Sequence, residues 1–310
     1  MLLVVGLNPT LDVVMRVNRP SFGQLNIAEK AAAYPSGKAM NLTRYLAQLG
    51  HDTLMLGLIG QDEYAHFADA AATSGARHQF TVLDQPTRIN VKIIDSGSGQ
   101  DTEFNMRGPS VTPEHLAAVE KTILEHLPRA EAIAFTGSLP PGAPVDTYAR
   151  WIALARQHGV PAALDASGKR LSLGLAAHPW LVKVNWFELS QQVGEESVGE
   201  ERAAGMLRDW NASGTSIACV TRADRVIMAA DGVLWEATTP RQVAQNPVGA
   251  GDALLAGLLN GWRSTLAPDE MLRRACAVAV ASVLTMDPGS FSTRDYEAIL
   301  GQVKVERKTG

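Results

Sequence analysis

The stretch PVGAGDALLAG, residues 247–257, sets two glycines around an alanine, followed by an aspartate and an apolar run. Glycine-rich turns often begin helices, so an ordinary helix start is one interpretation. In the other, the backbone N–H groups of Gly249, Ala250 and Gly251 converge at a helix start and bind an anion. Asp252 would then lie beside that anion and accept a proton from a hydroxyl group. Phosphoryl transfer needs both features, stabilised phosphate oxygens and a positioned base.

The surrounding sequence has the pattern of an α/β protein with a mainly parallel sheet flanked by helices on both faces. After residue 112, short apolar stretches alternate with longer stretches of helical periodicity. The predicted helices span 114–127, 145–158, 200–212, 252–263 and 268–285, and the predicted strands span 131–135, 161–165, 181–184, 216–220 and 226–230. Before residue 80 the predicted elements are a strand at 2–7, a helix at 41–49, a strand at 53–59 and a helix at 64–73.

Two strand-rich pieces without helices interrupt this pattern. One contains Val13–Val17 and Leu25–Ala33, and the other contains Phe80–Leu83, Arg88–Ile94 and Thr102–Met106. Small sheets that project from α/β domains often act as lids over a binding site. The predicted division is a main domain of residues 1–11, 36–79 and 109–310, with an inserted β-sheet lid of residues 12–35 and 80–108.

Composition argues against several classes of protein. With 310 residues, 46% of them hydrophobic, the chain can bury one large core or two smaller ones. The net charge of −4 and the lack of a Lys/Arg run argue against a nucleic-acid partner. The apolar run Ala275–Leu284 is too short to span a bilayer, so no membrane partner is expected. Cys219 and Cys276 form no CxxC pair, and the first residues resemble a buried strand rather than a signal peptide. We therefore expect a cytoplasmic protein.

Several familiar motifs are absent from the sequence. Gly37-Lys38 is not a P-loop, because Ala32 and Ala39 stand where that motif needs a glycine and a hydroxyl residue. No GxGxxG follows the first strand, and no GxSxG occurs. The seven histidines include no i, i+4 pair, so a histidine metal site is not expected.

Polar residues follow the first strand, at the edge where α/β sheets place ligands. Asp12, in NPTLD, can bind sugar hydroxyls, or it can cap a turn. In SGKAMN, Gly37 lets a ligand approach the backbone and Asn41 offers both a donor and an acceptor. The alternative there is a loop with an asparagine near a helix N-cap.

Two later groups also carry suitable polar side chains. Arg88, Asn90 and Lys92, in TRINVK, lie on one face of a strand and could grip a phosphorylated ligand, or they could form a solvated face. Asn185 and Glu188 are three residues apart on a first helical turn. They can reach phosphate and Mg²⁺-bound water, or they can simply begin the helix.

In chain order these motifs resemble the ribokinase-type sugar kinases, the phosphofructokinase B family. The likeness covers nearly the whole chain and rests on LNPTLD, GKxxN, TRINVKI, TGSLPPG at 136–142, NxxE at 185–188 and NPVGAGDALLAG, which is the most specific. It is strongest to the branch that phosphorylates sugar phosphates, which includes 1-phosphofructokinase, tagatose-6-phosphate kinase and the minor 6-phosphofructokinase. Within that branch, TRINVKI and the following EFNMRG favour the first.

The resemblance implies an enzyme that uses ATP and Mg²⁺ to phosphorylate a phosphorylated ketohexose, with fructose 1-phosphate giving the 1,6-bisphosphate. It makes Asp252 the base and the amides of Gly249, Ala250 and Gly251 the anion hole. The residues it assigns to the sugar or its phosphate are Asp12, Gly37, Lys38, Asn41, Arg88, Asn90 and Ser138. Those it assigns to the nucleotide are Asn185, Glu188, Thr221, Gly249 and Gly251, with Glu188 reaching the metal through water. It also implies a lid that can mediate dimerisation.

Three positions depart from the family pattern. Ser36 and Ala39 replace glycines around the lysine, and their extra Cβ atoms would crowd a sugar against the backbone. The loop at 221–225 is short and has no glycine, which affects the nucleotide site. Two alternatives therefore stay open. One is a kinase for another acceptor, such as tagatose 6-phosphate, fructose 6-phosphate or a non-phosphorylated sugar. The other is a catalytically silent sugar-phosphate-binding regulator.

Overall fold

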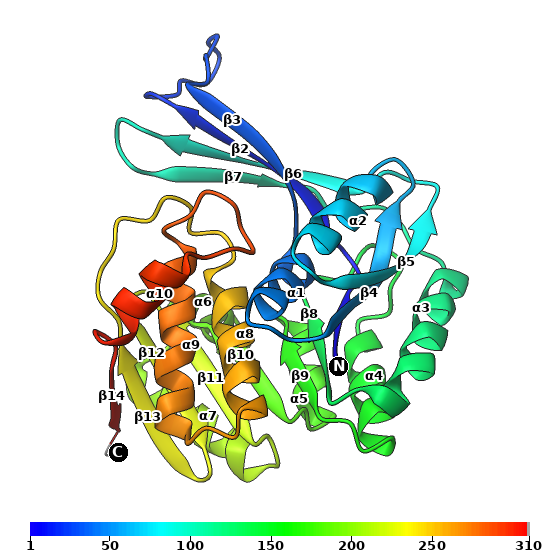
Figure 1. Ribbon diagram of the computed structural model, residues 1–310, viewed down its shortest axis with the longest axis vertical. Helices are drawn as coiled ribbons and strands as arrows, with labels where there is room; N and C mark the ends of the chain where they lie inside the picture. The colour runs from blue at the N-terminus through cyan, green and yellow to red at the C-terminus, as the bar shows by residue number, and fades with distance from the viewer. Residues whose placement is uncertain (309–310) are drawn as a thin grey trace.

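The protein, described by a computed structural model over residues 1–308, is built on one large twisted sheet from which a smaller sheet projects (Figure 1). From one edge to the other, the strands of the large sheet are β14 (Lys304–Arg307), β13 (Val233–Thr238), β12 (Arg225–Ala230), β11 (Ile217–Arg222), β10 (Leu181–Asn185), β9 (Ala162–Asp165), β8 (Ala132–Thr136), β1 (Leu2–Gly6), β4 (Thr53–Gly60) and β5 (Arg77–Leu83). Neighbours from β5 to β11 pair in parallel, and the last three strands pair antiparallel. The predicted mainly parallel α/β fold is confirmed.

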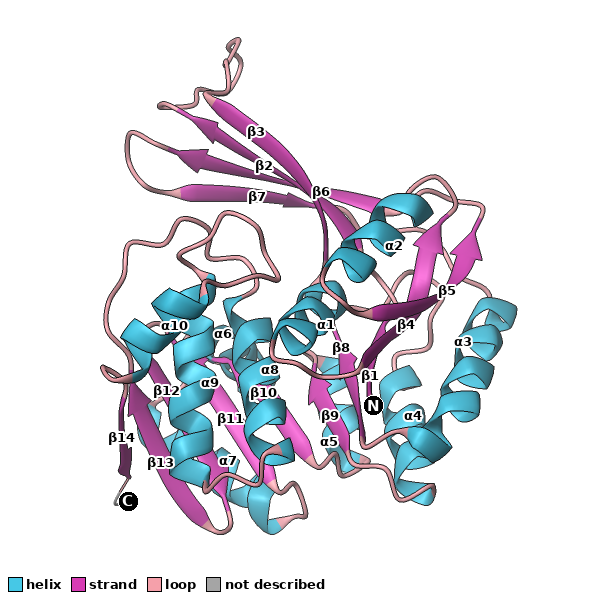
Figure 2. Ribbon diagram, in the orientation of Figure 1, coloured by secondary structure: helices cyan, strands magenta, loops and turns pink. Residues whose placement is uncertain are grey.

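The helices lie on both faces of the large sheet (Figure 2). One layer comprises α1 (Lys38–Gln48), α2 (Tyr64–Thr73), α8 (Ala250–Arg263), α9 (Pro268–Ser282) and α10 (Thr293–Leu300). The other comprises α3 (Pro113–His126), η1 (Leu127–Arg129), α4 (Thr147–Gln157), α5 (Lys169–Ala176), α6 (Trp186–Val193) and α7 (Glu200–Ala212).

Strand alternation divides the core into two hydrophobic layers. In the fully buried strand β1, Leu2 and Val4 pack into one layer, and Leu3 and Val5 pack into the other. Because successive side chains of a strand point to opposite faces, a central strand covered by helices on both sides reads as a continuous apolar run. The N-terminal run LLVV is explained in this way.

Helices α8 and α9 pack closely because glycines face the contact. A Cβ on Gly257 would lie 2.4 Å from Cα of Ala275, and one on Gly261 would lie 2.5 Å from Cγ of Met271. The absence of these side chains lets the two backbones approach. This packing fixes the position of α8, whose first turn belongs to the site described below.

The small sheet lies over the carboxyl ends of the parallel strands (Figure 1). Its strands, in spatial order, are β3 (Lys30–Ser36), β2 (Thr10–Val17), β6 (Arg88–Asp95) and β7 (Asp101–Asn105). The register of the parallel pair β2 and β6 sets Thr10 beside Arg88 and Asp12 beside Asn90. Side chains at paired positions share one face of the sheet, so this register gathers polar groups on one side.

Two expectations about the elements were wrong. The strand expected at 80–83 in the lid belongs to the large sheet, because β5 pairs in parallel with β4 and forms the edge of that sheet. The strand expected at 25–33 begins only at Lys30, and the residues before it form an exposed loop. The helices α5 and α10 and the antiparallel strands β13 and β14 were not predicted. They are short elements, for which periodicity is a weak signal.

No helix within residues 1–308 is both long enough and apolar enough to cross a membrane.

Candidate active site

A cavity of about 390 Å³, the central pocket, lies between the small sheet and the beginning of α8. It forms where the carboxyl ends of parallel strands open toward the small sheet, the usual place for ligands in α/β folds. Most predicted site residues line it: Asp12, Gly37, Lys38, Asn41, Arg88, Asn90, Asn185, Thr221, Gly249, Ala250, Gly251 and Asp252. Residues separated by up to 240 positions in the sequence therefore meet in one cavity.

The start of α8 supplies one wall of the central pocket. Gly249 is the N-cap residue and has a φ of 89°, a left-handed conformation that favours glycine. A Cβ at this position would also lie 3.0 Å from the hydroxyl of Tyr45. Gly249, Ala250 and Gly251 line the pocket, and the first N–H groups of a helix have no partner within the helix. A helix start and an anion site would use the same N–H groups, so the two interpretations of PVGAGDALLAG are compatible.

Asp252 lies in this first turn and is buried, with 5% of its surface exposed. Its Oδ2 accepts a hydrogen bond of 2.9 Å from the side-chain amide of Asn41. Burial raises the pKa of Asp252 to about 6, and the charge of Asp165 adds to this rise, while Lys38, Lys183 and Asn41 oppose it. A carboxylate with a pKa close to neutrality is well matched to accept and release a proton.

The small sheet supplies the opposite wall. Asp12, Arg88, Asn90 and Lys92 all line the central pocket, so the predicted common face is confirmed. Oδ1 of Asp12 is buried and has no hydrogen-bond partner within residues 1–308, and burial raises the pKa of this carboxyl group. A buried acceptor without a partner is costly unless a ligand supplies a donor. A hydroxyl group of a ligand would meet that need.

Lys92 and Arg88 are largely engaged by the protein itself. Lys92 forms ion pairs of 2.7 and 2.8 Å with Asp101 and Glu103 on β7. The guanidinium of Arg88 donates to the backbone oxygens of Asn8, Pro9 and Met106. The bonds from Arg88 to Asn8 and Pro9 join the small sheet to the loop after β1.

A buried ionic network that the sequence analysis missed lies beneath the pocket. Oδ1 of Asp165 accepts from Nζ of Lys38 at 2.5 Å, and its Oδ2 accepts from Nζ of Lys183 at 2.7 Å. Burial alone would raise the pKa of Asp165, but the two lysines hold it below its ordinary value. Burial opposes the charge of Lys38, yet Asp165 and Glu188 raise its pKa above the ordinary value. Lys38 is therefore held as a cation.

Lys183 lies next to the beginning of α8. A Cβ on Gly251 would lie 2.7 Å from Nζ of Lys183, so a side chain at position 251 would displace the ammonium group. A cation and a helix N-terminus consequently face the same space. One signal could have revealed this residue, since Lys183 is the only charged residue in the apolar strand LVKVN.

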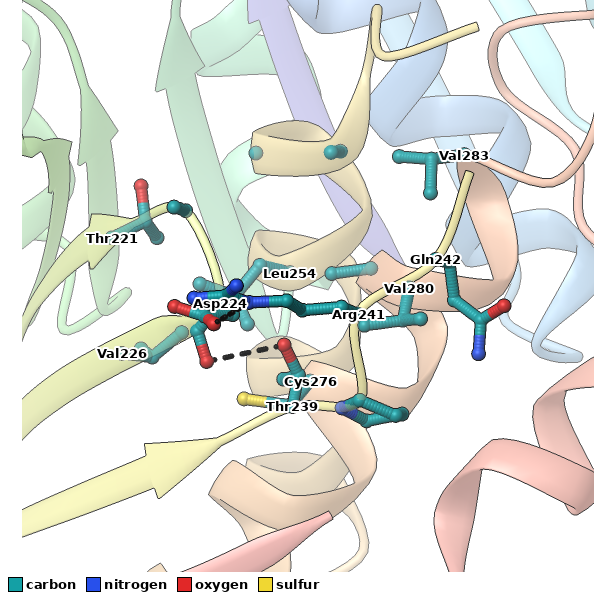
Figure 3. A pocket seen from close by; sticks show the side chains of 15 residues that line it. Thr221, Asp224, Val226, Thr239, Arg241, Gln242, Leu254, Cys276, Val280 and Val283 are labelled. Carbon is teal, nitrogen blue, oxygen red and sulfur yellow. Dashed lines mark hydrogen bonds and ion pairs between the residues drawn. The ribbon is translucent and has the colours of Figure 1, made fainter. Parts of the chain in front are cut away.

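A second cavity of about 580 Å³, the outer groove, adjoins the central pocket (Figure 3). The two cavities share Thr221, Ala250 and Gly251. One side of the groove is apolar, with Leu254 on α8 and Val280 and Val283 at the end of α9. Its other side is polar and is made by the β11–β12 turn and the segment after β13. The start of α8 thus lies between two ligand-sized cavities.

The β11–β12 turn is short and has no glycine, as the sequence indicates. It is a two-residue hairpin turn, Ala223 and Asp224, between Arg222 and Arg225. Ala223 has a φ of 45°, a conformation in which glycine is the favoured residue. The turn still lines the outer groove, so the loss of glycine has not removed this wall.

A third cavity of about 180 Å³, the rear pocket, lies on the other side of Lys38. It contains Ser138 and Glu188, the predicted site residues that do not line the central pocket. Gly37, Lys38 and Arg88 line both cavities, which places two cations between them. Ser138 also accepts a hydrogen bond of 2.9 Å from the side-chain amide of Asn8. The rear pocket therefore suits a small anion next to the central pocket.

Asn185 and Glu188 form a reciprocal capping box at the beginning of α6. The Asn185 side chain accepts from the backbone N–H of Glu188 at 2.8 Å, and the Glu188 side chain accepts from that of Asn185 at 2.9 Å. The structural interpretation of this motif is thus correct. The other carboxylate oxygen of Glu188 lies 3.4 Å from Nζ of Lys38. The role of Glu188 in binding a metal through water stays a prediction.

The two departures around Lys38 have different consequences. The methyl group of Ala39 points toward β1, where a Cβ on Gly6 would lie only 2.3 Å from it. Ala39 does not line the central pocket, but it lines the rear pocket. Gly6 makes the room that this methyl group needs. Ser36 is buried and lines the central pocket, and its hydroxyl lies 3.4 Å from Oδ1 of Asn41.

A family model for the pfkB carbohydrate kinases matches residues 1–294. This chain belongs to the PfkB family of carbohydrate kinases. It is 31% identical over 309 residues to 1-phosphofructokinase of Haemophilus influenzae, which covers 97% of this chain and 96% of that protein. It is 34% identical over 288 residues to 1-phosphofructokinase of Rhodobacter capsulatus, which covers 92% and 90%. The predicted family is confirmed.

Solved structures of PfkB-type kinases share this fold. Phosphofructokinase-2 of Escherichia coli, in complex with substrates and products, superposes with a TM-score of 0.88 at 23% identity, covering 97% of this chain and 98% of that one. The ribokinase of Arabidopsis thaliana, complexed with ribose and ATP, superposes with a TM-score of 0.78 at 21% identity, covering 96% and 98%. The ribokinase-like fold predicted from the sequence is therefore correct. Membership of this family implies that ATP is the phosphoryl donor.

Proposed function

We propose that this PfkB kinase transfers the terminal phosphoryl group of ATP to a hydroxyl group of fructose 1-phosphate, giving fructose 1,6-bisphosphate. The observation that carries the proposal is the position of Asp252 and the first turn of α8 at the junction of the central pocket and the outer groove. Both relatives named above are 1-phosphofructokinases, which supports this acceptor.

The outer groove suits the nucleotide. Its apolar side offers a surface for a purine base, and its inner end reaches Thr221 and Gly251. The terminal phosphate would then lie at the first turn of α8, where the amides of 249–251 and the ammonium group of Lys183 face it. Helix N-termini and cations both stabilise phosphate oxygens.

The central and rear pockets suit a phosphorylated sugar. Asp12 and Asn41 would hold sugar hydroxyls in the central pocket, and Gly37 allows the sugar to approach the backbone. The existing phosphate would enter the rear pocket between Lys38, Arg88 and Ser138. An anion in the rear pocket would meet Lys38, which already has carboxylate partners, and Arg88, which already binds backbone carbonyl groups. Binding of the anion therefore depends on rearranging those contacts.

The reaction follows from this placement. Asp252 takes the proton of the attacking hydroxyl group, whose oxygen forms a bond to the terminal phosphorus while the bond from that phosphorus to ADP breaks. The helix start and Lys183 stabilise the charge that develops on the phosphoryl oxygens. Protonated Asp252 then releases its proton to solvent when the products leave.

The residues near the junction fit a magnesium ion that is held mainly by phosphates and water. Within residues 1–308, no group of three or more His, Cys, Asp or Glu side chains could hold a metal ion. Mg²⁺ commonly uses one or two protein ligands and keeps several waters. Asn185, which lines the central pocket, and Glu188, which caps the same helix from the side of the rear pocket, would hold it through water. The bound ion would neutralise charge on the nucleotide phosphates.

Steady-state kinetics with a panel of acceptors tests this proposal. ADP release would be measured with fructose 1-phosphate, fructose 6-phosphate, tagatose 6-phosphate, fructose and ribose, each with ATP and with GTP. The proposal predicts the highest kcat/KM for fructose 1-phosphate. A preference for fructose 6-phosphate or tagatose 6-phosphate would make that sugar the acceptor in place of fructose 1-phosphate. Activity on neutral sugars alone would refute the proposal that the acceptor is a sugar phosphate. Binding of sugar phosphate without any turnover would favour a silent regulator.

We also propose that two copies associate through the lid. Its face away from the central pocket carries apolar side chains, including Ile89 and Phe104, which are 41% and 47% exposed, and the β2–β3 loop exposes Phe22. Exposed apolar patches of this kind often mark interfaces between proteins. Light scattering should give a dimer for the wild type and a monomer for Phe104→Asp. A monomeric wild type would contradict this assembly.

A further inference from the structure

The outer groove has an ion pair across its mouth (Figure 3). Nε of Arg241, on the segment after β13, lies 2.9 Å from Oδ2 of Asp224 on the β11–β12 turn. Both residues line the groove. The pair therefore connects two separate segments that border the same cavity.

The Asp224 end of this bridge is fixed by the backbone. The carbonyl oxygen of Asp224 accepts from the backbone N–H of Thr239 at 2.8 Å and from its hydroxyl at 3.2 Å. The β12–β13 register places Arg225 opposite Thr238, next to this contact. The turn and the segment after β13 thus form one frame, and Asp224 extends from it over the groove.

The side chain of Arg241 has room to change its conformation when a ligand binds. Its side chain is 90% exposed, whereas that of Asp224 is 28% exposed, so the carboxylate is the more constrained partner. An exposed ion pair contributes little to the stability of the fold. A contribution to stability therefore does not explain why Arg241 lies at the groove.

The opposite side of the groove is apolar. Leu254 on α8 and Val280 and Val283 at the end of α9 form it, and none of them offers a hydrogen bond to a base. A flat aromatic ring on this surface would expose its second face toward Arg241. The planar guanidinium group is well suited to stack on such a face, through cation–π attraction.

We propose that Arg241, held by Asp224, covers the base of the bound nucleotide and contributes to nucleotide affinity. The inference rests on the proposed placement of the nucleotide in the outer groove. Because stacking acts on the face of the ring rather than on its edge, the contribution is similar for adenine and guanine. Arg241 is a binding residue in this account and takes no part in the chemical step.

Kinetics of Arg241→Ala test the proposal directly. At saturating sugar phosphate, the KM for ATP and the KM for GTP should each rise about three- to tenfold, with little change in kcat or in the KM for the sugar phosphate. Arg202→Ala is the matched control, because Arg202 is another exposed arginine, 57% exposed and paired with Glu195, but it lies on α7 away from the groove. An unchanged or lowered nucleotide KM in Arg241→Ala would refute the proposal.

Two further variants separate stacking from charge. Arg241→Lys keeps the positive charge but lacks the planar group, so its KM for ATP should rise nearly as far as that of Arg241→Ala. A wild-type KM in Arg241→Lys would contradict stacking. Asp224→Asn releases the arginine, and it should raise the KM about twofold and reduce the additional effect of Arg241→Ala, since the two residues act as a unit.

Binding measurements distinguish this inference from the proposed function. Calorimetry would compare a non-hydrolysable ATP analogue with inorganic tripolyphosphate, which has no base. Arg241→Ala should weaken binding of the analogue and leave that of tripolyphosphate unchanged, whereas equal weakening of both would assign Arg241 to the phosphates and refute stacking. A wild-type protein that binds neither ligand would refute the nucleotide site itself, and with it the proposed function.

Discussion

The side-chain amide of Asn41 donates a hydrogen bond of 2.9 Å to Oδ2 of Asp252. This bond joins α1 to α8 and orients the carboxylate that the proposed reaction uses as its base. It also stabilises the charged form of Asp252, so it opposes the effect of burial on the pKa of this group. The bond therefore contributes to both geometry and protonation.

The first prediction concerns the pH dependence of activity. Asp252 must be deprotonated to act as a base, and its pKa is about 6, so kcat should fall as the pH drops below about 6. Asn41→Ala removes a bond that lowers this pKa and should move the acidic limb of the pH–rate profile to higher pH. Profiles of kcat for both proteins would measure this. A limb that stays in place, or moves to lower pH, would contradict the assigned base.

The second prediction concerns Asp252 and stability. In the unfolded chain an aspartate has a pKa near 3.9, so a folded pKa of about 6 means that ionisation of Asp252 destabilises the fold. That cost is fully present above pH 6 and disappears as the pH falls toward 4. Asp252→Asn should thus raise the free energy of unfolding at pH 8 by about 1–3 kcal/mol, with a much smaller gain at pH 4. Its kcat should fall by orders of magnitude.

Urea denaturation of the two proteins at both pH values measures that difference. Equal free energies of unfolding at pH 8 would show that ionisation of Asp252 does not destabilise the fold. A variant with nearly wild-type turnover would remove Asp252 from the reaction.

The third prediction tests the buried ionic network. Asp165→Asn removes the counter-charge of two lysines, one of which, Lys183, is almost fully buried. Loss of one partner from a buried ion pair costs about 3–5 kcal/mol, because the remaining charge is uncompensated. Asp69→Asn, at an exposed position on α2, is the control and should change stability very little. Similar urea midpoints for the two variants would mean that the network contributes nothing to the fold.

The fourth prediction uses the contact between Gly6 and Ala39. A Cβ at position 6 would lie 2.3 Å from that of Ala39, so Gly6→Ala should destabilise the protein by about 1–3 kcal/mol through overpacking. Ala39→Gly in the same chain removes the opposing methyl group and should recover most of this loss. Thermal unfolding of the single and double variants provides the comparison. Additive losses in the double variant would show that the two positions do not compete for space.

Much of the fold could be predicted because its parallel strands are short apolar runs between amphipathic helices. The strand at residues 80–83 could not be assigned to the correct sheet, since alternation identifies a strand but not its partner. β13 and β14 were missed because they follow a hairpin and a short helix at the sheet edge, where the repeating strand–helix pattern has ended. Pairing between distant segments is information that local periodicity does not contain.

The candidate site could be predicted where chemistry and backbone geometry coincide in a short motif, as at Gly249–Asp252. Asp165 and Lys183 were missed because each stands alone in an apolar strand, and their ion pair exists only after β9 and β10 are neighbours. Ser138 and Glu188 were predicted as ligand residues, but their place in a separate rear pocket follows from the packing around Lys38. The motifs therefore identified residues of the candidate site, and the fold determined which cavity each residue lines.

The proposed transfer to fructose 1-phosphate is tested most directly by phosphorus NMR of the reaction mixture. The purified protein would be incubated with ATP, Mg²⁺ and fructose 1-phosphate, with Asp252→Asn as the inactive control. We predict that the ATP signals give way to those of ADP while a second sugar phosphomonoester signal appears, that of fructose 1,6-bisphosphate. An unchanged fructose 1-phosphate signal, with ATP either intact or hydrolysed to free phosphate, would contradict it.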